Sequence, residues 1–138
     1  MYYDFLKGEN KMKFLHAMIR VKDIQKSLDF YQNLFNMELC KKKRLEDCEL
    51  YFLEDKETGF QIELTYNDQT PKDGYEIGTG FGHFAFGIKS MEEFSEKLKS
   101  LNYEYLYEPY DLTGKGSKIA FVKDPDGYEI EIIEKVVW

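Results

Sequence analysis

Two histidines and two glutamates stand at matching places in the sequence. His16 and His83 are the only histidines of the chain, and Glu63 and Glu131 follow them after 47 and 48 residues. Imidazole nitrogens and carboxylate oxygens bind divalent transition metals, and two of each leave coordination positions open for water. Two buried carboxylates without a cation would be costly, because desolvation and like-charge repulsion both oppose ionisation. The spacing therefore predicts a metal site of the open, catalytic kind.

The residues around His16 predict the elements that position the first pair. The segment KFLHAMIRV (13–21) alternates in hydrophobicity, which predicts a half-buried strand with His16 and Arg20 on its polar face. DIQKSLDFYQNLF has apolar residues at helical spacing behind the N-cap residue Asp23, so a helix of about three turns is expected. Shorter strands are expected over residues 38–44, 49–54 and 60–66.

The same order of elements returns in the second half of the chain. It contains a strand (GHFAFGIK), a helix (SMEEFSEKLKSL) and three further strands (YEYLYE, SKIAFVK and GYEIEIIE). A repeated βαβββ unit predicts an α+β fold, because only a second unit can cover the open face of the curved sheet of the first. We expect one structural domain with an N-terminal extension (1–12), a first unit (13–66), a connector (67–80) and a second unit (81–138).

Strand alternation also predicts which residues share a face with the histidines. The apolar faces should lie under the helices, which leaves both histidines and both glutamates on the opposite, concave face. Glu129 shares this face with Glu131, but it lies nearer the preceding turn, so we prefer Glu131 as the ligand. Gln61 competes more weakly with Glu63.

Composition excludes several classes of protein. The 138 residues are 43% hydrophobic and carry a net charge of −7, which fits one globular domain and argues against a nucleic-acid partner. No apolar run is long enough for a membrane span or a signal peptide, so a cytoplasmic location is expected. Cys40 and Cys48 form no metal or disulfide motif and are predicted to be free thiols. The basic run at 41–44 is interpreted as a solvated strand edge.

At these residues the sequence resembles the glyoxalase I (lactoylglutathione lyase) family of the vicinal oxygen chelate superfamily. The resemblance covers about residues 13–134 and rests on HAMIRVKDIQKSLDFYQNLFNMEL, QIELTYN, GTGFGHFAFGI and IAFVKDPDGYEIEIIE. It implies paired βαβββ modules and a homodimer with sites at the subunit interface. Each site would take His16 and Glu63 from one chain and His83 and Glu131 from the other. The short form resembles the nickel- or cobalt-activated group, although the ligand chemistry alone also permits zinc.

The resemblance also implies a reaction and roles for residues. The hemithioacetal of methylglyoxal and glutathione would be isomerised to S-D-lactoylglutathione through an enediolate stabilised by the metal. Glu131 would be the base, with Glu63 as a ligand and a partner in the second proton step. Arg20 and Asn67 would bind glutathione. The glycyl carboxylate would meet a basic residue in DLTGKGSK, where the family spacing is altered, so Lys115 and Lys118 both stay candidates.

Four other functions are weighed against this one. An acyl-CoA epimerase resembles this family but carries glutamine at the position of Glu63. A ring-cleaving dioxygenase needs two histidines and one carboxylate, and a thiol-transferring antibiotic-resistance enzyme also uses three protein ligands. A metal-free binding module would use aromatic residues such as Phe81, Phe84, Phe86 and Tyr110, and would bind no metal. The sequence leaves open which low-molecular-weight thiol is used.

Overall fold

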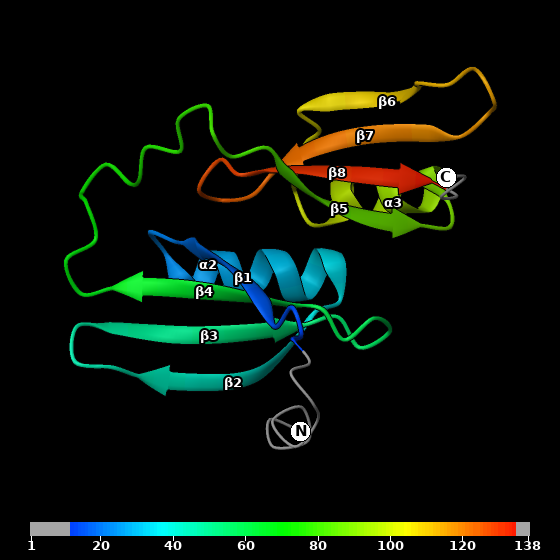
Figure 1. Cartoon of the computed structure of the whole chain (residues 1–138). Helices are drawn as coiled ribbons and strands as arrows, with labels where there is room; N and C mark the ends of the chain where they lie inside the picture. Colours follow the sequence, from blue (N-terminus) through cyan, green and yellow to red (C-terminus); the bar gives the residue numbers. More distant parts are fainter. Residues whose placement is uncertain (1–11, 135–138) are drawn as a thin grey trace.

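The computed structural model describes residues 12–134, so nearly all of the predicted extension over residues 1–12 lies outside the described residues. Eight strands form two four-stranded sheets, in the orders β1-β4-β3-β2 and β5-β8-β7-β6. Figure 1 shows one sheet above the other, with helix α2 behind the first and helix α3 behind the second. In each sheet the first and last strands of the unit are parallel neighbours, and the remaining pairs are antiparallel. The predicted repeat of a βαβββ unit is confirmed.

The elements follow the predicted segments closely. The first unit consists of β1 (His16–Arg20), α2 (Ile24–Asp29), the π-helical turn η1 (Phe30–Leu34), β2 (Glu38–Arg44), β3 (Cys48–Glu54) and β4 (Gln61–Asn67). The second consists of β5 (His83–Ile88), α3 (Met91–Ser100), β6 (Tyr107–Asp111), β7 (Lys118–Lys123) and β8 (Glu129–Glu134). No helix among residues 12–134 is long and apolar enough to cross a membrane.

The first helix changes its winding halfway along. Asp23 caps α2 as predicted, because its side chain accepts a hydrogen bond from the backbone N–H of Lys26 at 3.1 Å. From Phe30 the chain continues as the π-helical turn η1. The wider π turn lets the consecutive side chains of Phe30 and Tyr31, 1% and 0% exposed, both reach the core.

The strand predicted over YEYLYE (103–108) is wrong in position. Tyr103 packs edge-on against Phe30 with ring centroids 5.2 Å apart, and the Tyr105 hydroxyl lies 2.6 Å from Ser95 Oγ on α3. These aromatic contacts hold residues 103–105 on the helix side of the sheet. Strand β6 therefore begins only at Tyr107, directly after the backbone N–H of Leu106 bonds to the carbonyl of Phe121 at 2.7 Å.

The two units share one hydrophobic core, which contains side chains from both sheets and from the helices. Phe35 of the first unit stacks on Phe86 of the second with ring centroids 4.1 Å apart. Polar contacts connect the same units at the turn before β8. The hydroxyl of Tyr31 donates to Asp124 at 2.7 Å, and the backbone N–H of Lys22 donates to Asp126 at 2.8 Å. These contacts fix the end of β1 against the start of β8.

Candidate metal centre

Each sheet carries one close pair of a histidine and a glutamate. His16 Nε2 lies 3.1 Å from Glu63 Oε1 in the first sheet, and His83 Nε2 lies 3.2 Å from Glu131 Oε1 in the second. In both sheets the histidine stands on the first strand of the unit and the glutamate on the last, which are parallel neighbours. The internal repeat of the sequence is thus a repeat of the side-chain arrangement.

The pairs lie on the sheet faces that point away from the helices. On β1 and β4, Ile19 and Leu64 point to the core and are 4% and 0% exposed, and the pair occupies the other face. The side chains of Glu63 and Glu131 are only 12% and 15% exposed, while those of His16 and His83 are 29% and 44% exposed. Each carboxylate is therefore shielded, with its imidazole nearer to solvent.

The separation of the donor atoms fits a shared metal ion. Two donors bound side by side and at right angles to one ion, each about 2.1 Å away, lie about 3 Å apart. The distances of 3.1 and 3.2 Å match this separation. Each sheet thus holds one nitrogen and one oxygen ready to act as neighbouring ligands.

One chain does not gather all four residues. Among residues 12–134, no three histidine, cysteine, aspartate or glutamate residues lie close enough together to hold one ion. The structure therefore forms two separate halves of the predicted four-ligand set. The Nδ1 atom of His16 is also buried without a hydrogen-bond partner in the described part of the chain.

The side chains also distinguish between neighbouring candidates. Backbone register places His83 opposite Glu129 and His16 opposite Gln61, yet the imidazoles contact Glu131 and Glu63. Side chains in a strand lean along the strand direction, so the contact forms with the residue two positions further on. The geometry thus favours Glu131 over Glu129 and Glu63 over Gln61.

Sequence reasoning missed the aromatic residues that support both imidazoles. Phe52 meets His16 edge-on with ring centroids 5.3 Å apart, and Phe121 meets His83 in the same way at 5.5 Å. Phe52 pairs with Glu63 across the sheet, and Phe121 with Glu131. Their signal in the sequence is an aromatic residue on the strand next to each glutamate, which becomes visible only once the strand pairing is known.

A second missed residue is Thr65, two positions after Glu63 on β4. Its hydroxyl donates a buried hydrogen bond of 2.6 Å to Glu63 Oε2. The other oxygen of the same carboxylate faces His16. Both oxygens of Glu63 are therefore held by neighbouring side chains.

The predicted substrate-binding residues lie at the ends of strands. Arg20 is exposed at the end of β1, and its carbonyl accepts a hydrogen bond from the Tyr128 hydroxyl at 3.0 Å. Asn67 ends β4, and its amide nitrogen donates to the Tyr75 hydroxyl in the connector at 2.8 Å. The guanidinium of Arg20 takes part in neither of these hydrogen bonds.

Lys115 lies in the turn between β6 and β7, and Lys118 begins β7; both are exposed. Asp111 fixes this turn by accepting hydrogen bonds from the backbone N–H groups of Gly116 at 2.7 Å and Gly114 at 2.8 Å. These bonds, that of Gly116 first, lower the pKa of Asp111 from its ordinary value. The turn is thus an ordered platform for a basic side chain.

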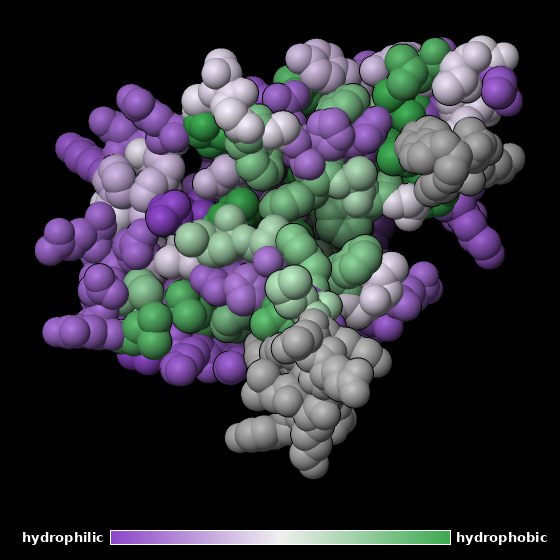
Figure 2. All heavy atoms as spheres, viewed as in Figure 1, coloured by the Kyte–Doolittle hydropathy of each residue, from purple (hydrophilic) through white to green (hydrophobic). Residues whose placement is uncertain are grey.

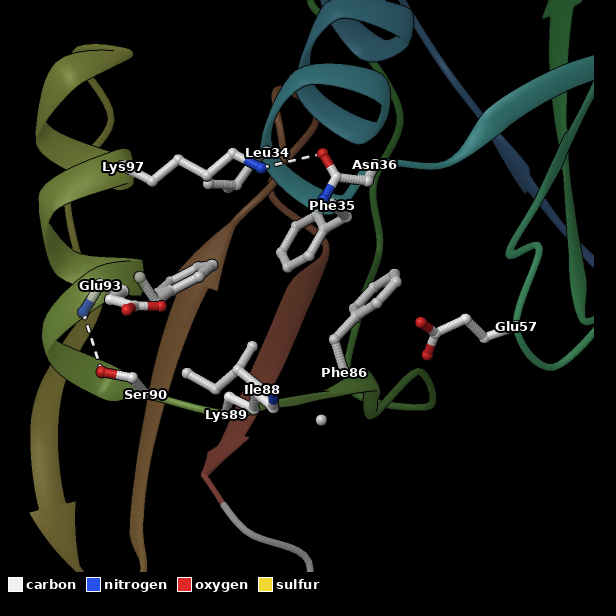
Figure 3. Close-up of a pocket in the computed structure, with 12 residues that line it drawn as sticks. Leu34, Phe35, Asn36, Glu57, Phe86, Ile88, Lys89, Ser90, Glu93 and Lys97 are labelled. Carbon is white, nitrogen blue, oxygen red and sulfur yellow. Dashed lines mark hydrogen bonds between the residues drawn. The ribbon is translucent and has the colours of Figure 1, made fainter.

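A hollow of about 550 Å³ lies on another part of the molecule (Figure 3). Phe35 and Phe86 point into it, and Lys97 at its rim donates to Asn36 at 3.0 Å. None of the four histidine and glutamate residues lines this hollow. The candidate centre therefore lies outside this hollow.

Known proteins share both the sequence and this architecture. Residues 13–132 match the Glyoxalase/Bleomycin resistance protein/Dioxygenase superfamily. A lactoylglutathione lyase from Haemophilus influenzae is 39% identical over 89% of this chain and 93% of that protein. A lactoylglutathione lyase from Arabidopsis thaliana is 39% identical over 94% of this chain but 46% of that protein. The chain thus spans about half the length of the plant relatives it matches.

Solved structures agree with this assignment. Glyoxalase I from Zea mays has a TM-score of 0.78 and 38% identity, and covers 88% of this chain and 44% of that chain. The trypanothione-dependent glyoxalase I from Leishmania major has a TM-score of 0.74 and 30% identity, over 91% of this chain and 88% of that chain. The α+β fold predicted from the repeat is confirmed. The chain belongs to the Glyoxalase/Bleomycin resistance protein/Dioxygenase superfamily and, within it, to the family of the lactoylglutathione lyases.

Proposed function

We propose that the protein is a divalent-metal-dependent lactoylglutathione lyase. It isomerises the hemithioacetal of methylglyoxal and glutathione to S-D-lactoylglutathione and so detoxifies methylglyoxal. The observation that carries the proposal is the repeated pair of histidine and glutamate with donor atoms 3.1 and 3.2 Å apart. The high coverage of short bacterial lactoylglutathione lyases at 38–40% identity supports it.

We assign His16, Glu63, His83 and Glu131 as the metal ligands. A bound divalent cation would supply positive charge for the substrate oxygen that becomes negative when a neighbouring carbon loses its proton. Nickel or cobalt is the expected metal, from the resemblance to the short group, and zinc is the alternative that the donor set also fits.

Glu131 acts as the base in this proposal. Its carboxylate takes the proton from the carbon that carries the sulfur, and this proton is then delivered to the adjacent carbon, which was the carbonyl carbon. The hydroxyl proton moves between the two oxygens in the same sense, so the hemithioacetal becomes a hydroxy thioester with no change in composition. The burial of Glu131 and the edge of Phe121 beside His83 limit the access of water to this transfer.

The proposed substrate contacts lie at the ends of β1 and β4 and in the turn between β6 and β7. Arg20 offers an exposed guanidinium on the strand of His16, suited to a carboxylate of glutathione. Asn67 offers a side-chain amide positioned by Tyr75 for the glutamyl end. Lys115 lies on the turn anchored by Asp111 and is assigned to the glycyl carboxylate. Use of a glutathione adduct as substrate, together with the two free cysteines, favours the cytoplasm as the site of action.

A homodimer would join the two halves of the metal site. Strands β1 and β5 are edge strands; β5 carries no lysine, arginine or acidic residue, and the one arginine of β1, Arg20, stands at its end. Neither strand has the lysine or acidic residues that discourage pairing with another chain. Phe14, Leu15 and Met18 are 83%, 41% and 40% exposed along β1 and just before it. Figure 2 shows hydrophobic surface across the middle of this face. Since large exposed apolar patches mark interaction sites, we infer that a second copy covers it.

The opposite edge of the first sheet differs in character. Strand β2 is exposed throughout and carries Lys41, Lys42, Lys43 and Arg44. A lysine-rich edge discourages strand pairing. The contrast between β2 and β1 favours β1 as the strand that meets the second copy.

The test is removal and restoration of the metal. The protein is stripped with a chelator, then supplied separately with nickel, cobalt, zinc or buffer, and thioester formation from methylglyoxal and glutathione is followed. We expect activity to vanish on stripping and to return best with nickel or cobalt. Metal binding without thioester formation would refute the substrate assignment, and absence of metal binding would refute the site.

A further inference from the structure

The two carboxylates of the proposed centre differ in how they are held. Glu63 Oε1 faces His16 Nε2 at 3.1 Å, while its Oε2 accepts the buried hydrogen bond from Thr65 at 2.6 Å. Glu131 Oε1 faces His83 Nε2 at 3.2 Å. Two residues after Glu131, on the same face of β8, stands Ile133, which has no hydroxyl. Within residues 12–134, His83 is the one side chain that contacts the Glu131 carboxylate through a polar atom.

The remaining surroundings of the two carboxylates match. Each glutamate has a phenylalanine opposite it on the next strand, Phe52 for Glu63 and Phe121 for Glu131. Each of these rings meets the histidine of its own pair edge-on. The exposed fractions of the two glutamate side chains are close, at 12% and 15%. The hydroxyl of Thr65 is thus the main polar difference between the halves.

We propose that Thr65 is a positioning residue that makes the two glutamates unequal. Its hydroxyl holds Glu63 as a fixed ligand, and Ile133 at the equivalent place leaves Glu131 free to turn and carry the proton. This inference rests on the proposed function and adds the reason why one carboxylate of a repeated pair serves as the base.

The hydrogen bond has the properties that this role requires. A distance of 2.6 Å lies in the range of charge-assisted bonds from a hydroxyl to a carboxylate, which are about twice as strong as neutral ones. With both oxygens held, Glu63 cannot rotate its carboxyl group without losing a contact. Glu131 is held through one oxygen and rotates at a smaller cost. Groups that support a metal ligand in this way typically contribute about 10- to 100-fold in metal affinity.

Two exchanges with matched controls test the inference. Thr65→Val removes the hydroxyl and nearly keeps the shape of the side chain. Thr65→Ser is the control, because it keeps the hydroxyl. Ile133→Thr introduces a hydroxyl at the equivalent place beside Glu131, and Ile133→Val has the same shape as threonine without the hydroxyl. Nickel affinity is measured by competition with a chelator, and kcat and KM are measured at saturating nickel.

We expect Thr65→Val to bind nickel about 10- to 100-fold more weakly than the wild type, and Thr65→Ser to bind it nearly as tightly as the wild type. At saturating nickel its kcat should change much less than its affinity. Ile133→Thr should lower kcat by about tenfold relative to Ile133→Val, the effect of one hydrogen bond that must break in each cycle, while KM is kept and nickel affinity does not fall.

Wild-type nickel affinity in Thr65→Val would overturn the inference, as would equal kcat values in folded Ile133→Thr and Ile133→Val. The affinity measurement needs no substrate, so it stands even where Ile133→Thr fails to fold. It also separates this inference from the proposed function. A wild-type protein that binds nickel but forms no lactoylglutathione would refute the function, and the affinity of Thr65→Val would still decide the role of Thr65.

Discussion

Glu131 and Glu129 stand on the same face of one strand, but only Glu131 reaches His83. We therefore expect Glu131→Gln to lower kcat by about 10²- to 10⁴-fold, because a positioned base contributes that much to proton transfer. Glu129→Gln is the matched control and should stay within about threefold of the wild type, since removal of this carboxylate leaves the pair intact. Steady-state kinetics at saturating nickel measures both. A larger loss in Glu129→Gln would show that the wrong carboxylate has been assigned.

Arg20 offers a different kind of test, because its proposed role is in binding. Loss of a hydrogen bond to a charged group costs about 1.5–3 kcal/mol, so Arg20→Ala should raise KM for the hemithioacetal about 10- to 100-fold. Its kcat should change little. Lys26→Ala, at an exposed position on α2, serves as the control for lost positive charge. An equal rise in KM for both variants would indicate long-range electrostatics and not a contact by Arg20.

The sequence repeat identified both pairs of histidine and glutamate, but it did not identify Thr65, which supports one of them. The four candidate residues were identified because the chain repeats itself and holds only two histidines. Thr65 was missed, because a threonine two residues after a glutamate is ordinary in a strand. Its importance depends on a 2.6 Å contact that no spacing reveals.

The packing of elements around the turn before β8 predicts a pH effect on stability. Burial raises the pKa of Asp124 from 3.8 to about 6, although hydrogen bonds from Tyr31 and from backbone N–H groups oppose the shift. Between about pH 4 and pH 6 the folded protein keeps a proton that the unfolded chain has released. The contribution of Asp124 to the free energy of unfolding therefore falls as pH rises through this range and is constant above it.

Asp124→Asn removes this titration. The free energy of unfolding of the wild type, minus that of the variant, should fall by at most about 3 kcal/mol between pH 4 and pH 7. Burial also raises the pKa of Asp126, and because Asp126 is present in both proteins, taking the difference removes most of this second contribution. Urea unfolding of both proteins at several pH values measures this difference in the free energy of unfolding. A difference that does not change with pH would contradict the burial of an ionisable Asp124.

The hydrogen bond from Tyr31 to Asp124 predicts a second effect on stability. Tyr31 is fully buried and donates to Asp124 at 2.7 Å. Tyr31→Phe should lower the free energy of unfolding at pH 7 by about 1–3 kcal/mol, because a buried carboxylate loses a donor. Tyr51→Phe, which loses a longer contact of 3.2 Å to Glu49, should cost less than about 0.5 kcal/mol. Equal effects would mean that the contact between the units contributes little.

At the level of elements, the predicted order was correct and two local features were not. The repeat of strand, helix and three strands follows from hydrophobic periodicity, which the sequence displays. The shift of β6 to Tyr107–Asp111 depends on Tyr103 and Tyr105 packing against the helices. The π-helical turn depends on burying Phe30 and Tyr31 together. In both cases tertiary contacts override the structure that the local sequence pattern predicts.

For the whole molecule, the central claim is that one site takes its ligands from two chains. The separation of the pairs within one chain supports this claim, as do the edge strands β1 and β5, which carry neither lysine nor acidic residues. Neither His16→Ala nor His83→Ala should be active alone, since every site of each dimer would lack one ligand. A mixed dimer of the two variants contains one intact site and one site that lacks both histidines.

The most direct measurement is therefore complementation between these two inactive variants. They are mixed in equal amounts, allowed to exchange subunits, supplied with nickel and assayed for lactoylglutathione formation. Random exchange should restore about a quarter of the wild-type activity per chain, because half of the dimers are mixed and each has one intact site. Mixed dimers that form, as shown by tagging one variant, but stay inactive would contradict a shared site.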